Sequence, residues 1–185
     1  MSFDSPFVEY LIIGTHTSSW ILLMVMAAFR VPLSKLGSID AASFLLLLPF
    51  IYLIGMLTDS TVYYPLEPFR KKIRDSVINY ENYKDEFIAF SSPELYSAYD
   101  VRVRRVRIMG AAIFNWLFLG IALLLHIGFT QVYQSVLVIT LTLLLSLLSI
   151  ITWRGLYHRA YKFRKNACDV IRSGVEKPKG KTSGK

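Results

Sequence analysis

The sequence predicts an all-α integral membrane protein with four transmembrane helices. Apolar residues make up 54% of the 185 residues and charged residues 18%, and the mean hydropathy is +0.42. This composition is too apolar for an ordinary soluble domain. The apolar residues gather in four blocks, 7–29, 41–57, 108–129 and 132–153. A helix needs roughly 20 residues to cross a bilayer, so each block is a candidate span.

The first block contains two ionisable residues, Glu9 and His16. Residues 1–6 include an acid and no base, so they lack the basic region of a signal peptide, and we expect a true span. On a helix, Glu9 and His16 share one wide face with Thr15 and Ser19. Structural hydrogen bonds within the protein explain such a face, and a proton relay between Glu9 and His16 is the alternative.

The charged segment 58–107 predicts a cytoplasmic helical segment between spans two and three. Pro68 is well placed to open an amphipathic helix there. Residues 91–94, Ser-Ser-Pro-Glu, are typical of a helix start, and no helix breaker follows before Gly110. We therefore expect the third span to begin near Pro93 and to enter the membrane without a break.

The last two spans carry polar residues on defined faces. Asn115 and His126 share an arc of about 60° with small residues on span three, which favours contacts between helices. Span four has no charge, and four of its hydroxyls fall within a similar arc: Ser135, Thr142, Ser146 and Ser149. Lipid offers hydroxyls no partner, so this stripe should face water or protein. We take its members as candidate pore-lining residues, with packing inside a helix bundle as the alternative.

The basic residues predict the orientation in the membrane. Nine lie in segment 58–107 and ten in 154–185, whereas the connection between the first two spans has Arg30 and Lys35. The positive-inside rule then puts both termini in the cytoplasm of a multi-pass inner-membrane protein. The chain thus divides into spans one and two (1–57), the cytoplasmic segment (58–107), the hairpin of spans three and four (108–153) and a basic tail (154–185).

A dense group of arginines lies beside the membrane. Four occur within residues 102–107 and a fifth opens the tail: Arg102, Arg104, Arg105, Arg107 and Arg154. Such residues commonly anchor a protein to anionic lipid. At this density they also favour anions, either permeant ions or the phosphates of a ligand. Four helices are too few to enclose a wide conduit, so a pore implies a homo-oligomer.

The sequence argues against an enzyme. Its three histidines show no metal-ligand spacing, nucleophile and phosphate-loop motifs are absent, and Cys168 is the single cysteine. We therefore expect no catalytic residues, no metal and no cofactor.

The layout of paired spans, a cytoplasmic segment at 65–107 and a basic stretch at 154–165 resembles one known group. It is similar to the small four-span membrane effectors of bacterial antiphage operons, among them the Hailong type. The resemblance implies an oligomeric channel controlled by a nucleotide or oligonucleotide ligand. We therefore expect an anion-favouring, ligand-gated channel with a role in antiviral defence. The alternative is a non-conducting membrane subunit that recruits a soluble cytoplasmic partner.

Overall fold

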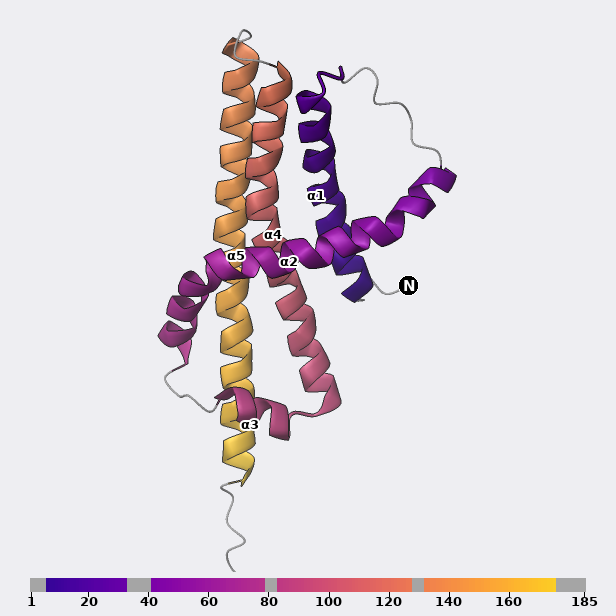
Figure 1. Cartoon of the computed structure of the whole chain (residues 1–185). Helices are drawn as coiled ribbons and strands as arrows, with labels where there is room; N and C mark the ends of the chain where they lie inside the picture. The colour runs from indigo at the N-terminus through magenta and orange to yellow at the C-terminus, as the bar shows by residue number, and fades with distance from the viewer. Residues whose placement is uncertain (1–5, 33–40, 79–82, 128–131, 176–185) are drawn as a thin grey trace, which may run out of the picture.

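The computed structural model describes residues 6–32, 41–78, 83–127 and 132–175, and all regular structure within these ranges is helical. Of the helices in this part of the chain, four are long and apolar enough to cross a membrane, namely α1, α2, α4 and α5. Figure 1 shows them with the short α3. Their bounds are Pro6–Ala28 (α1), Ala41–Val77 (α2), Tyr83–Phe90 (α3), Pro93–Ile127 (α4) and Val132–Val175 (α5). The chain is thus a multi-pass α-helical membrane protein.

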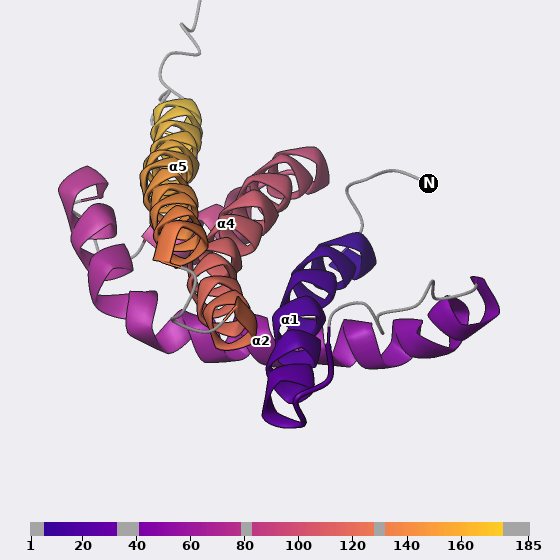
Figure 2. The same cartoon turned by 90° about the horizontal axis from the view of Figure 1, so that it is seen from above.

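Helices α4 and α5 form the central hairpin, and they pack side by side in both views (Figures 1 and 2). The predicted continuous helix from Pro93 into the membrane is confirmed, since α4 runs for 35 residues. Its first turn is capped by Ser92, whose hydroxyl accepts the Leu95 N–H at 3.3 Å. Helix α5 continues for 44 residues, well past the apolar block. Both helices therefore extend beyond a bilayer's hydrocarbon core, which a helix of roughly 20 residues crosses.

Helix α2 differs from the prediction, because it continues without a break from the second apolar block to Val77. The expected separate helix opening at Pro68 is not formed. Pro49, Pro65 and Pro68 all lie inside α2 with exposed side chains. Each proline removes a backbone hydrogen bond and favours a bend. A helix can nevertheless bend at a proline and continue, rather than end there, when the segments on both sides of the proline are held by packing. Figure 2 shows the resulting curvature of α2.

The second helix also runs across α1, α4 and α5 rather than alongside them (Figures 1 and 2). It meets α1 where Gly14 faces Gly55. A Cβ atom on Gly14 would collide with the carbonyl oxygen of Ile51, and one on Gly55 with that of Tyr10. Two glycines therefore permit a backbone-to-backbone crossing, and the four long helices do not form a parallel bundle.

A small core closes the charged end of the molecule. Helix α3, which the sequence did not predict, places Phe87 against Ile78, Tyr161 and Cys168, all of them buried. Tyr99 of α4 joins this core and meets Phe87 edge to face at 5.1 Å. This core holds α2, α3, α4 and α5 together below their apolar parts. Lys35, residues 130–131 and the tail beyond Val175 lie outside the described residues.

Candidate functional site

The hydroxyl stripe of α5 lies in the contact with α4. Ser135, Thr142, Ser146 and Ser149 are all buried. The Ser146 hydroxyl donates to the carbonyl oxygen of Ile113 at 3.4 Å. Gly120 makes room for Thr142, since a Cβ there would lie 2.7 Å from the Thr142 Oγ1. The structure therefore shows these hydroxyls buried within the chain, as the packing alternative expects, with Thr142 and Ser146 against α4.

Asn115 joins three helices. Its Oδ1 accepts a hydrogen bond from Trp20 Nε1 at 3.0 Å, and the Thr17 hydroxyl lies 3.1 Å from the same oxygen. The Thr58 hydroxyl of α2 lies 3.2 Å from that of Thr17. Asn115 thus links α1 directly to α4, and Thr17 extends the link to α2. This is the contact between helices that small residues around a polar side chain favour.

The ionisable residues of the first and third spans have different surroundings. His126 Nε2 lies 3.0 Å from the carbonyl oxygen of Leu23, so it also joins α4 to α1. Glu9 is buried, whereas His16 is exposed, with its ring centroid 5.3 Å from that of Trp116. Because one is buried and the other exposed, the structure offers no support for a relay between Glu9 and His16.

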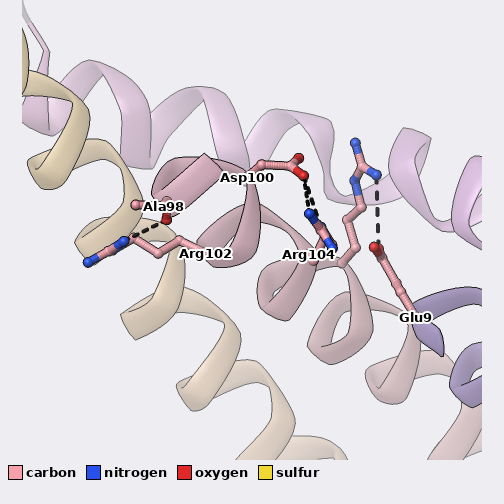
Figure 3. Close-up of polar contacts among 6 residues, drawn as sticks. Glu9, Ala98, Asp100, Arg102 and Arg104 are labelled. Carbon is pink, nitrogen blue, oxygen red and sulfur yellow. Dashed lines mark hydrogen bonds and ion pairs between the residues drawn. The ribbon is translucent and has the colours of Figure 1, made fainter. Parts of the chain in front are cut away.

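Two of the predicted arginines contact other groups of the same chain. Arg102 donates from Nη1 to the carbonyl oxygen of Ala98 at 2.5 Å, and its guanidinium lies 4.0 Å from the Phe163 ring centroid. Arg104 Nε donates to Asp100 Oδ2 at 2.9 Å (Figure 3). Asp100 therefore balances the charge of Arg104 from one turn away on the same helix.

The remaining predicted arginines differ in their environment. Arg107 Nη1 lies 3.9 Å from Glu9 Oε1, which joins α4 to the start of α1. Figure 3 shows the Glu9 carboxylate pointing toward α4. Arg105 and Arg154 have exposed side chains. The five arginines therefore do not converge on one ligand site.

A cavity of about 990 Å³ lies elsewhere, in a cleft between α2, α4 and α5. We call it the basic cleft, because six basic and two acidic side chains line it. The basic residues come from four helices: Arg70, Lys71, Arg74, Lys84, Arg107 and Arg164. Four tyrosines complete the polar lining: Tyr63, Tyr99, Tyr157 and Tyr161.

Two arginines define the chemistry of the basic cleft. The Arg70 guanidinium lies 3.8 Å from the Tyr63 ring centroid, and its Nη1 is 3.1 Å from Glu67. Arg164 is 8% exposed, and its Nε has no hydrogen-bond partner within the described ranges. A buried guanidinium nitrogen without a partner is costly, and an anion would satisfy it. The tyrosine rings beside these cations offer apolar faces on which a flat ring can stack.

The sequence analysis missed most of this cleft, although one signal was present. Trp153, Tyr157 and Tyr161 repeat at every fourth position, and Arg164 follows on the same side of the helix. That pattern marks an aromatic and cationic face on α5. The contributions of Arg70 and Lys84 from other helices leave no such trace.

No protein-family model matches the chain, and the comparisons with curated proteins and with solved structures found no match. The class stated above, a multi-pass α-helical membrane protein, therefore rests on its helices and their apolar composition.

Proposed function

We propose that the protein is an oligomeric ion channel gated by a nucleotide or short oligonucleotide that binds in the basic cleft. One observation carries the proposal: Arg164 is buried in a cleft rich in cations and tyrosines, with its Nε unpartnered among the described residues. Phosphate oxygens suit the guanidinium groups, and a nucleobase suits the tyrosine faces. The volume of about 990 Å³ is ample for a mononucleotide.

The exposed polar face of α1 supports the pore. Thr15, His16 and Ser19 are exposed on a helix apolar enough to cross a membrane. The two hydroxyls bond to carbonyl oxygens of their own helix, at 2.7 and 2.8 Å, but the His16 ring would remain unfavourable in lipid. Several copies arranged around an axis would turn this face toward water. The pore wall then comes from α1, because the stripe of α5 is occupied by packing.

The charge distribution supports the remaining parts of the proposal. The exposed Arg105 and Arg154 lie beside the apolar parts of α4 and α5, where copies of both would favour anions at the pore mouth. The excess of basic residues in 58–107 and 154–185 supports a cytoplasmic cleft in an inner-membrane protein. A ligand-gated channel of this layout also accords with the resemblance to antiphage effectors, and so with a defence role.

The second candidate is a non-conducting subunit that recruits a soluble partner. It is favoured by apolar side chains exposed at the charged end of the molecule. Phe69 of α2 is 60% exposed, and Ile88 and Phe90 of α3 are 55% and 62% exposed. Exposed aromatic residues of this kind are typical of surfaces that bind proteins or membranes.

Liposome flux separates the two candidates. We expect ATP or a short oligoadenylate, added on the side of the basic cleft, to change chloride flux through the reconstituted protein. Arg164→Gln should weaken this response about tenfold or more, because a hydrogen bond to a charged group contributes roughly 1.5–3 kcal/mol. Arg159→Gln on the exposed side of the same helix is the matched control. Correctly assembled protein that passes no chloride with or without ligand would contradict the channel and favour the recruiting subunit, whereas flux that neither ligand alters would contradict gating by a nucleotide.

A further inference from the structure

Arg107 lies between the basic cleft and the buried carboxylate of α1. It lines the basic cleft and also an adjoining pocket of about 370 Å³ that contains Asp59. Its Nη1 is 3.9 Å from Glu9 Oε1. One guanidinium therefore borders both the proposed ligand site and the helix that carries the exposed polar face.

Glu9 depends strongly on this arginine. It is 2% exposed, and neither carboxylate oxygen has a hydrogen-bond partner within the described part of the chain. Arg107 lies within ion-pair distance of it, and Arg104, Asp59 and Asp100 are the other charged groups nearby. A buried carboxylate with two acids nearby needs a cation beside it.

The contact between Arg107 and Glu9 can nevertheless be replaced by a contact between Arg107 and another anion. A separation of 3.9 Å is too long for a charge-assisted hydrogen bond, which spans about 2.7–2.9 Å. The Arg107 side chain is 43% exposed, so its guanidinium is not locked in place. A phosphate group in the basic cleft would offer the same guanidinium short hydrogen bonds. Glu9 and a phosphate bound in the basic cleft would therefore compete for Arg107.

We infer that Arg107 transmits occupancy of the basic cleft to α1. An anionic ligand draws the Arg107 guanidinium toward the cleft and away from Glu9. The ionic contact between α4 and the start of α1 is then lost, and the uncompensated carboxylate favours a new position of α1 in which water reaches it. This inference rests on the proposed function and names how the same site is regulated.

Competition between Glu9 and the ligand for Arg107 can be distinguished by binding measurements from a purely structural contact between Glu9 and Arg107. If Glu9 competes with the ligand, removing its charge strengthens ligand binding, because coupling between sites is reciprocal. This increase in ligand affinity must also require the Arg107 side chain. If the pair only holds the two helices together, Glu9→Gln changes stability and leaves ligand affinity unchanged.

A double-mutant cycle tests the inference with the full-length protein in detergent micelles. ATP and a short oligoadenylate are the probes, and isothermal titration calorimetry gives their affinities for wild type, Glu9→Gln, Arg107→Gln and the double variant. We expect Glu9→Gln to raise affinity about fivefold in the wild-type background. In the Arg107→Gln background the same change should have no effect. Glu94→Gln, an exposed acid on α4, should leave affinity unchanged.

The outcomes separate the inference from the proposed function. Unchanged affinity in Glu9→Gln, or an equal gain in both backgrounds, would overturn the coupling while ATP binding by wild type upholds the ligand site. Failure of wild type to bind either probe would instead overturn the ligand site, and the coupling with it. Size-exclusion chromatography checks that each variant is folded, and Glu9→Met serves in the same cycle if Glu9→Gln is unstable.

Discussion

Gly14 of α1 and Gly55 of α2 lie backbone against backbone where the two helices cross. A Cβ on either glycine would meet a carbonyl oxygen of the other helix, Ile51 or Tyr10. A flexible side chain could move aside, but a helix backbone can yield only if the whole crossing shifts. This pair of glycines therefore sets how closely α2 can cross α1.

The first prediction tests this crossing. Gly14→Ala should lower the free energy of unfolding by about 1–3 kcal/mol, the usual cost of overpacking. Gly155→Ala is the control, because nothing lies within 4 Å of a Cβ at that exposed position of α5. The control should gain about 0.5–1 kcal/mol from the helix preference of alanine. Unfolding in detergent, followed by circular dichroism, measures both; equal effects would contradict the tight crossing.

A second prediction concerns the stripe of α5. Thr142→Leu should destabilise the α4–α5 hairpin by about 1–3 kcal/mol, because Thr142 is buried directly against Gly120 of α4 and a larger side chain would overpack that contact. Thr140 lies on the exposed side of the same helix, so Thr140→Leu should be nearly neutral. The same unfolding assay compares the two substitutions. A stable Thr142→Leu variant with reduced conductance would contradict the packing role and indicate that the hydroxyl stripe lines the pore.

The exposed face of α1 supplies a third prediction. If Ser19 borders the pore, Ser19→Leu should lower single-channel conductance, because a larger apolar side chain narrows and dewets the conduit. Thr140→Leu also removes an exposed hydroxyl, but from α5, and should leave conductance unchanged. Planar-bilayer recording of assembled oligomers measures both variants. Identical conductance in Ser19→Leu and wild type would place the pore elsewhere.

Topology can be tested by labelling single introduced cysteines. Cys168 is buried, so it should contribute little background in the folded protein. A membrane-impermeant maleimide should label Gly37→Cys from outside intact spheroplasts, because the basic residues favour an external loop there. Ser97→Cys, at an exposed position of α4, should react only after permeabilisation. The reverse pattern would invert the predicted orientation.

Several features were predictable because they depend on local rules. The length and apolarity of the four blocks indicate helices that can span a membrane, and the structure contains such helices. The start of α4 follows from Ser92 and Pro93, since capping needs only residues within one turn. The continuity of α2 was not predictable, because a proline's cost is local whereas the packing that outweighs it comes from distant segments.

Periodicity identified the hydroxyls that share a face of α5, and in the structure all four of these residues are buried. It could not say what the face meets, because either α4 or water satisfies the same pattern. Predicting the basic cleft would have required the arrangement of three helices, since Arg70 of α2, Arg107 of α4 and Arg164 of α5 lie around one cavity. Helical rules place each arginine on its own helix, but only the crossing of α2 over α4 and α5 brings their side chains together.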